Sequence, residues 1–403
     1  MKKNNDIEWA LLVDACSASI IKNKGDNTLE SSSFNGIDWK RIEKMANHHR
    51  VWPLLCEAIL KSPDISNIPS TFLNKLKEER LYIAGINLKN THEFIRLITL
   101  FNQNNIEVIP YKGIVLGKVV YQDLGLREFG DFDFLFHLKD HAKIHQLLTN
   151  RNYEHRSAKP AILEKNHKKY GCEYSYKSIQ DDGSEFAVDL HWALGNKMLQ
   201  LDIGFDVFKQ LGSKQKLFDT DLHLLSSEGI LLSTCIHHSG KEQFSELRYL
   251  CDVAAIIKQY QSTIDWNNIL ALSKRLKVKN LLLYALGVTA HVFDLKLSPV
   301  IQEALSNKKI NRFIQTNVAS LSKDKIPKSI FQIIYFHLSF RSQWSTKLKV
   351  LYYSLLISIL PNKRDIKGEE LSTLAYWTLF LIKPFRLSKK YLLSMDSSKE
   401  QSH

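Results

Sequence analysis

The chain has 403 residues, of which 44% are hydrophobic and 24% are charged, and its formal net charge is +13. This length allows two or three domains with real cores, and the composition excludes collagen-like, coiled-coil and wholly disordered classes. Five widely spaced cysteines without a CxxC pair argue against a disulfide framework or a zinc site and suit a reducing cytosol. There is no signal-peptide pattern and no apolar run of ~18 residues, so we expect a cytoplasmic protein without a transmembrane segment.

The positive charge is concentrated at the C-terminal end of the chain. From Asn307 onward there are 17 Lys/Arg and 6 Asp/Glu, whereas residues 1–306 carry 38 and 36. A basic end on a nearly neutral body predicts an anionic partner, which could be nucleotide phosphates, nucleic acid or an anionic membrane surface. Charge alone does not choose among these partners.

Residues 1–103 are predicted to form an N-terminal helical region. Asp38 precedes an apolar stripe at helical spacing and is the expected N-cap of that helix. Pro53 fits the first turn of the next helix, where a missing N–H costs nothing. A loop at 61–69 should then lead into a long helix at about 71–104.

Residues 104–225 are predicted to form a small mixed α/β module. A short helix is expected after Gly113 and another at about 140–150, and Asp182-Gly183 is a good hairpin turn. Short β-rich runs between these features give the predicted strands 106–110, 131–136, 172–177 and 185–194.

Two helical regions are predicted to follow. The first, at 226–300, completes a cleft, and the second, at 301–403, is the basic end of the chain. The fold class is therefore α+β, a small mixed sheet flanked by N-terminal and C-terminal helices. The segment 371–393 begins as an apolar helix and becomes basic, and it is too short to span a bilayer. We expect it to pack on the body. The alternative is a helix at a membrane interface that inserts Trp377 and Phe380 and directs four cations to lipid phosphates: Lys383, Arg386, Lys389 and Lys390.

Three carboxylates have a pattern that suits metal binding. Asp131 and Asp133 lie two apart in a predicted strand, so both point to one face. Asp189 in the later strand could face them, and three convergent carboxylates suit a two-metal site for nucleotidyl transfer. Like charges side by side repel, so we expect Asn at position 131 or 133 to raise or preserve stability in the absence of metal. The alternative is an ordinary strand with a solvated polar face.

Basic residues nearby could hold a triphosphate. Gly113 opens a short helix whose N–H groups suit a phosphate, Lys112 adds a charge there, and Arg127 can pair with a phosphate in bidentate fashion. Each of them alone would more often be a solvated surface group.

The later helices contain further polar residues. His237 and His238 are adjacent on a helix and point about 100° apart, which argues against a shared metal and favours packing at the edge of the cleft. Arg248 and Asp252 are four apart, so they are expected either to form an ion pair or to act together, with Asp252 orienting Arg248 toward a phosphate.

In the order and spacing of these segments, the sequence resembles the bacterial uncharacterised nucleotidyltransferase family of the DNA polymerase β-like superfamily. The resemblance covers roughly residues 38–295. One departure is Ile114 after Lys112-Gly113, where the wider superfamily usually has a serine. The segments that carry the resemblance are 38–55, PYKGIVLGKVVY (110–121), LREFGDFDFLF (126–136), VDLHWAL (188–194) and the helical pair at 235–257.

The resemblance implies a nucleotidyltransferase that uses Mg²⁺ or Mn²⁺ and a nucleoside triphosphate (NTP). It would move a nucleoside monophosphate to an acceptor hydroxyl or phosphate and release pyrophosphate. Two alternatives stay open: a catalytically silent module that binds a nucleotide, nucleic acid or partner, and a toxin-like enzyme that modifies RNA or protein. The implied catalytic and metal residues are Asp131, Asp133 and Asp189, the nucleotide-binding residues Lys112, Gly113, Arg127 and Arg248, and the surrounding residues His191, His237, Lys241 and Asp252.

Overall fold

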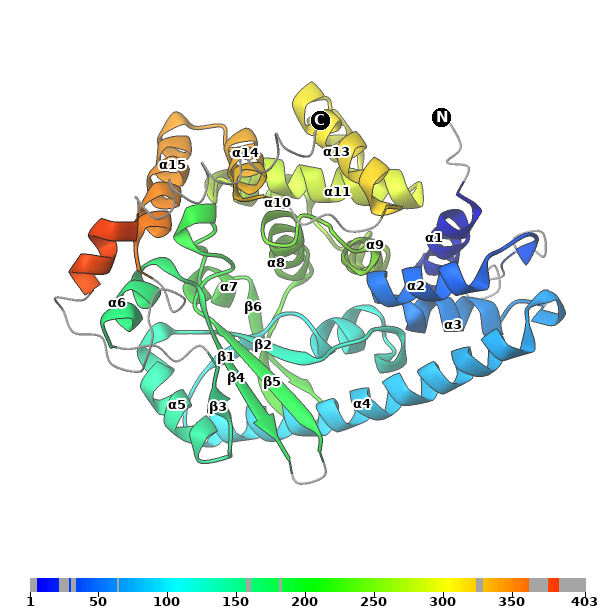
Figure 1. Cartoon of the computed structure of the whole chain (residues 1–403), viewed down its shortest axis with the longest axis horizontal. Coiled ribbons are helices and arrows are strands. Elements are labelled where there is room, and N and C mark those ends of the chain that lie inside the picture. The colour runs from blue at the N-terminus through cyan, green and yellow to red at the C-terminus, as the bar shows by residue number, and fades with distance from the viewer. Residues whose placement is uncertain are drawn as a thin grey trace, which may run out of the picture.

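The computed structural model describes residues 6–21, 29, 34–63, 65–156, 161–180, 183–323, 329–361 and 376–383. Helices surround a central sheet, with α4 along one side and the C-terminal helices on the other (Figure 1). The predicted α+β class is therefore confirmed. Among these described residues, none of the helices has the length and apolar character needed to cross a membrane.

The N-terminal helices begin close to where the sequence predicts. The Asp38 carboxylate accepts hydrogen bonds from the backbone N–H groups of Lys40 and Arg41, and Pro53 lies in the first turn of its helix. These helices share one apolar core with the helices after residue 226. Their bounds are α1 (Ile7–Ile20), α2 (Trp39–His49), α3 (Trp52–Leu60) and α4 (Ser70–Gln103).

The central sheet has five strands in the order β1-β2-β5-β4-β3. β2 and β5 are parallel, whereas the other neighbours are antiparallel. Each predicted strand is present, with ends that differ by a few residues. The strands are β1 (Val108–Pro110), β2 (Asp131–Phe136), β3 (Glu154–His155), β4 (Glu173–Ile179) and β5 (Glu185–His191), and the helices between them are α5 (His141–Thr149) and α6 (Ala161–Tyr170).

The turn between β4 and β5 is tight. Gly183 has φ +77°, a left-handed conformation that a Cβ disfavours, and its N–H donates to the carbonyl of Gln180. Asp182, the other predicted turn residue, lies outside the described residues.

A second hairpin, which the sequence pattern does not predict, consists of β6 (Gly212–Leu217) and β7 (Thr220–Leu225) and follows α7 (Phe205–Lys209). β6 is mostly exposed and polar, so it has no alternating pattern. Its turn places Phe218 and Asp219 at φ 52° and 57°, where Asn-Gly would be the usual signal. The expected short helix after Gly113 is present at residues 114–120, and its part Leu116–Val120 is π-helical.

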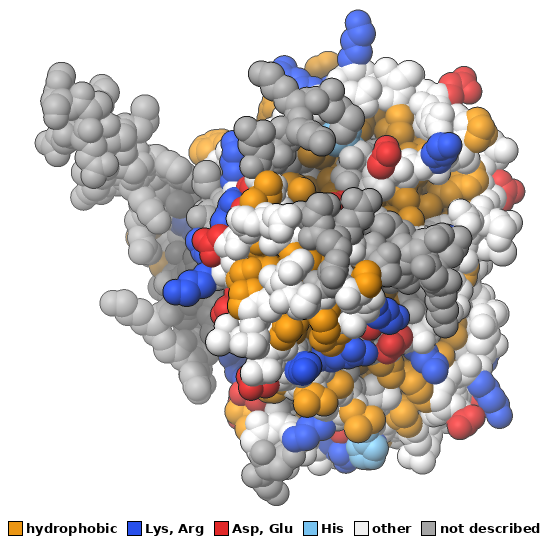
Figure 2. All heavy atoms as spheres, turned by 90° about the vertical axis from the view of Figure 1, so that its right-hand side faces the viewer, with side chains coloured by type: hydrophobic (Ala, Val, Ile, Leu, Met, Phe, Trp, Pro, Cys, Tyr) orange, Lys and Arg blue, Asp and Glu red, His pale blue; other side chains and the backbone are white. Residues whose placement is uncertain are grey.

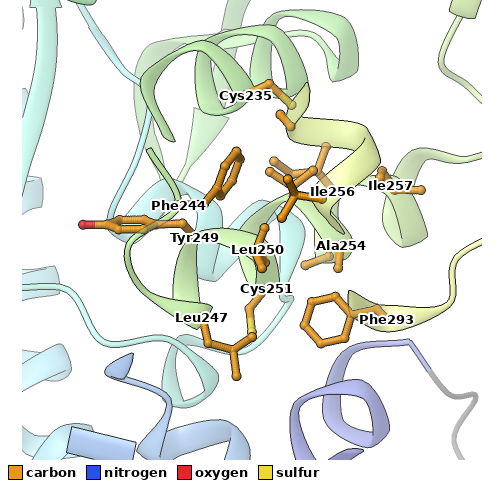
Figure 3. Close-up of a cluster of buried hydrophobic side chains, with 14 of the residues drawn as sticks. Cys235, Phe244, Leu247, Tyr249, Leu250, Cys251, Ala254, Ile256, Ile257 and Phe293 are labelled. Atoms are coloured by element: carbon orange, nitrogen blue, oxygen red, sulfur yellow. The ribbon is translucent and has the colours of Figure 1, made fainter. Parts of the chain in front are cut away.

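Beyond Ser226 the described chain is helical, as predicted. Cys235, Leu250, Cys251 and Phe293 pack in the core between these helices (Figure 3). All five cysteines are free and buried. The helices are α8 (Ser227–Gly240), α9 (Leu247–Tyr260), α10 (Trp266–Arg275), α11 (Lys279–Phe293), α12 (Pro299–Ala304), α13 (Lys308–Leu321), α14 (Ile330–Phe340) and α15 (Trp344–Ile359).

The described residues near the end of the chain agree only in part with the alternative in which the segment 371–393 lies at a membrane interface. Residues 376–383 include a helix, but Lys383 is buried and its Nζ donates to the carbonyl of Leu360 at 2.6 Å. Lys383 is therefore not placed to meet lipid phosphates. Arg386, Lys389 and Lys390 lie outside the described residues.

The two faces of β2 have different roles. Phe132 and Phe134 are buried against α4, with the rings of Phe94 and Phe134 stacked at 5.7 Å between centroids. Because side chains alternate along a strand, Asp131 and Asp133 point to the opposite face. Aromatic packing against α4 thus fixes the direction of both carboxylates.

Candidate active site

The parallel pairing of β2 and β5 brings the carboxylates together. Asp133 lies directly opposite Asp189 in the register, and Asp131 precedes Asp133 on the same face of β2. One ligand atom each from Asp133, Asp189 and His191 lies within 4.8 Å of the others. The strand that carries Asp189 therefore lies beside the strand that carries Asp131 and Asp133, as predicted.

These carboxylates are not electrostatically equivalent. Asp133, together with burial, raises the pKa of Asp131, and burial together with Asp133 raises the pKa of Asp189. Burial alone would also raise the pKa of Asp133, but Lys112 and His191 outweigh it and hold this pKa well below its usual range. Asp133 is therefore a compensated anion, whereas Lys112 and Arg127 offset the charge of Asp131 only in part, and His191 does the same for Asp189.

Lys112 provides most of that compensation. Its Nζ lies 2.6 Å from Oδ1 of Asp133 and 3.1 Å from Nε2 of His237. The next residue, Gly113, has φ +52°, and a Cβ there would lie 3.2 Å from the carbonyl oxygen of Asp131. Gly113 is thus required for the turn that brings Lys112 to β2.

A second cation contacts Asp133 from the sheet itself. Nε2 of His191 lies 2.9 Å from Oδ1 of Asp133, and its Nδ1 lies 3.1 Å from Oε2 of Glu173, which also pairs with Lys241 at 2.6 Å. Burial lowers the pKa of His191, but the contacts with Asp133 and Glu173 outweigh this effect and raise it. His191 therefore favours the imidazolium form, which bridges two carboxylates.

A chain of hydrogen bonds continues from Lys112 into the helices. The Lys112 ammonium can only donate, so Nε2 of His237 accepts and its Nδ1 carries the proton. Burial and the Lys112 charge lower the pKa of His237 well below its usual range, which agrees with a neutral ring. His237 Nδ1 lies 3.4 Å from Nδ1 of His238, whose Nε2 donates to Asp252 at 3.0 Å.

The chain of hydrogen bonds ends at Asp252, which forms an ion pair with Arg127. Nε and Nη2 of Arg127 donate to its two oxygens at 2.8 and 3.0 Å, and the hydroxyl of Tyr121 donates at 3.0 Å. Nη1 of Arg127 donates to the carbonyls of Gly113 and Glu128. Arg127 therefore holds the turn at Gly113, and its predicted contact with a nucleotide stays a prediction.

The predicted pairing of Arg248 with Asp252 is wrong. Nε of Arg248 donates to Glu246 at 2.7 Å and its Nη2 donates to the hydroxyl of Tyr249 at 2.9 Å. Asp252 instead faces Arg127, because α9 directs it into the core at 1% exposure. Helical spacing gives the neighbours on one helix, but not the partner that a second element provides.

Several residues at the site give no signal in the sequence. Glu173 reaches His191 only because antiparallel pairing sets the two opposite each other. Asn87 and Asn90 of α4 donate to the carbonyls of Arg127 and Phe129 at 3.0 and 2.9 Å, which fixes the loop before β2. Each of them is a single polar residue whose role depends on contacts far away along the chain.

The carboxylates fit a hard divalent cation. Asp133, Asp189 and His191 could together hold a metal ion by distance. Because His191 favours the protonated form, the oxygens are the better donors, and oxygen ligands suit Mg²⁺ or Mn²⁺. The raised pKa values of Asp131 and Asp189 also indicate negative charge that a cation would stabilise.

The match to a sequence family agrees with this class of site. Residues 35–294 match the sequence model of a family described as uncharacterised nucleotidyltransferase, and the chain belongs to that family. Among solved structures, it is similar to an antigenic nucleotidyltransferase-like protein from Paracoccidioides brasiliensis at 17% identity and a TM-score of 0.29. That match covers 49% of this chain and 91% of the other. No curated protein matches the sequence.

Proposed function

We propose that the protein is a cytoplasmic, divalent metal-dependent nucleotidyltransferase with the chemistry of the DNA polymerase β-like superfamily. An oxygen of the acceptor forms a bond to the α-phosphorus of an NTP, and the bond from that phosphorus to the bridging oxygen of the β-phosphate breaks. The products are a nucleotidylated acceptor and pyrophosphate, and the acceptor's proton is released.

The observation that carries this proposal is the set of three carboxylates on neighbouring parallel strands, two of which have raised pKa values because the cations around them offset their charge only in part. Asp131, Asp133 and Asp189 would hold Mg²⁺ or Mn²⁺, which supplies charge stabilisation for the phosphates and the attacking oxygen. Lys112 is the cation nearest to these carboxylates, so it is placed to meet a phosphate when the metal takes over the charge of Asp133. Gly113 lets the backbone approach β2 closely enough for this contact.

The test is incubation of the full chain with each α-labelled NTP and Mg²⁺ or Mn²⁺, with pyrophosphate and transferred label as readouts. Asp189→Asn should abolish both. The matched control is Glu185→Gln at the exposed start of the same strand, which should retain them. NTP binding without pyrophosphate would instead support the silent binding module, and label on RNA or protein would support the toxin-like alternative.

The basic C-terminal quarter supports an anionic partner in addition to the nucleotide. The surplus of cations from Asn307 onward lies beyond the family match, which ends at 294. We propose that this region binds nucleic acid or an anionic membrane surface. A slope of log affinity against log salt measures the phosphates that are neutralised on nucleic acid.

A further inference from the structure

Helix α15 presents its large apolar side chains to solvent. Five of them keep between 48% and 76% of their surface exposed. At ~100° per residue they fall within an arc of about 100° on one side of the helix. These residues, the α15 apolar face, are Trp344, Leu348, Leu351, Tyr352 and Leu355.

The side of α15 that meets the body is the less apolar one. Its buried residues are Thr346, Val350 and Ser354, which recur every four positions. A helix that only covers a core places its largest apolar side chains inward. On α15, Val350 is buried and Tyr353 and Ile357 are half-buried on this side, but the five most exposed apolar side chains lie on the other, and packing on the described chain does not explain those.

Exposed apolar side chains also occur on α14 and in the segment 376–383. Tyr335 on α14 is 61% exposed, and Trp377 and Leu381 in the segment 376–383 are 54% and 65% exposed. Lys383 holds this segment at the C-terminal end of α15 through the carbonyl of Leu360, and its short helix lies next to that end of α15 (Figure 1). Large exposed apolar patches mark interaction surfaces.

Cations border the α15 apolar face on both sides. At ~100° per residue, Lys347 and Lys349 lie on either side of the arc, and Nζ of Lys347 is 4.6 Å from the ring centroid of Trp344. Residues 329–361 contain no Asp or Glu, and of their three Lys/Arg only Arg341 is buried. An apolar arc between lysines is the pattern of a helix lying in a membrane interface.

We propose that α15 docks the protein on an anionic lipid bilayer, with its apolar face among the acyl chains and its flanking lysines at the lipid phosphates. A helix of 16 residues is too short to span the hydrocarbon core and lies along the surface. A second copy of the chain fits less well, because a two-fold contact would bring the same lysines together with no acidic partner on the helix. This inference is independent of the proposed catalysis.

The test is co-sedimentation of the full chain with phosphatidylcholine vesicles that contain or lack phosphatidylglycerol. We expect binding only with phosphatidylglycerol, and weaker binding as salt rises. The double variant Leu348→Glu/Leu355→Glu should reduce binding on the order of tenfold or more. Its matched control is Leu81→Glu/Leu88→Glu on α4, at residues 75% and 72% exposed, and it should bind like the wild type. Figure 2 shows the opposite side of the molecule, where exposed apolar and charged side chains are interspersed.

Other outcomes would overturn the proposal. Equal binding by both double variants, or no binding by the wild type, would exclude docking through α15. Sedimentation velocity without lipid tests the second copy, since a dimer that Leu348→Glu/Leu355→Glu dissociates would assign the face to self-association. If that variant unfolds, Lys347→Gln/Lys349→Gln takes its place, and unchanged affinity for phosphatidylglycerol vesicles would then exclude the proposal.

Discussion

Substitution of the two carboxylates of β2 by asparagine should have opposite effects on stability in metal-free buffer. Asp133 is 6% exposed and contacts Lys112 at 2.6 Å and His191 at 2.9 Å. Asp133→Asn keeps the volume but leaves the buried Lys112 without its ion-pair partner and removes one of the two carboxylates that His191 contacts. Breaking a buried ion pair in this way costs about 3–5 kcal/mol of unfolding free energy.

Asp131→Asn should instead preserve or raise stability. Its pKa is raised chiefly by the neighbouring charge of Asp133, so its ionised form disfavours the fold as pH rises. Relief of one like-charge contact contributes roughly 0.2–1 kcal/mol. The sequence predicts that both substitutions relieve repulsion between like charges. The structure agrees for Asp131→Asn, but it predicts a loss of unfolding free energy for Asp133→Asn.

The assay is urea unfolding followed by circular dichroism at neutral pH with a chelator present. Lys112→Met added to Asp133→Asn should recover part of the loss, because it removes the buried charge that has lost its partner. Because the pKa of Asp133 is depressed, its stabilisation is complete above the unfolded value of about 4 and declines as pH falls below it. Equal unfolding free energies for the wild type and Asp133→Asn at neutral pH would refute the reasoning.

Three further predictions concern other contacts. Asp252→Asn should lower the unfolding free energy of the protein by about 3 kcal/mol. A double-mutant cycle with Arg127→Met should give a coupling energy above ~1 kcal/mol, and additive effects would contradict the bidentate ion pair. Gly113→Ala should lower the melting temperature and weaken NTP binding in a fluorescence titration, because φ +52° and the nearby carbonyl oppose a Cβ; unchanged affinity would exclude a role for this turn. Burial, and after it the charge of Arg341, lowers the pKa of His337 to about 3. As pH falls from about 6 to 4, the unfolded state takes up a proton on this histidine that the folded state does not. The unfolding free energy should therefore fall by roughly 1.4 kcal/mol for each pH unit. His337→Gln should flatten that slope in urea titrations, and an unchanged slope would show that other groups cause it.

The sequence by itself determined the local features of this protein. Alternation in 131–136 gives one aromatic and one acidic face, because side chains of a strand point to opposite sides whatever its neighbours are. The N-cap Asp38 and the first-turn residue Pro53 act within one helical turn, so they too can be predicted from adjacent residues. The surplus of positive charge after Asn307 is a property of composition alone.

Only the tertiary structure decided which partners these residues have. Lys112 and Asp133 are joined by a turn at Gly113, and Arg127 meets Asp252 across 125 positions of sequence. Neither pair has a periodic signal, because a period specifies the face of an element and not the element that packs against it. The compensated state of Asp133 depends on those packed partners, and so does the exposure of the α15 apolar face.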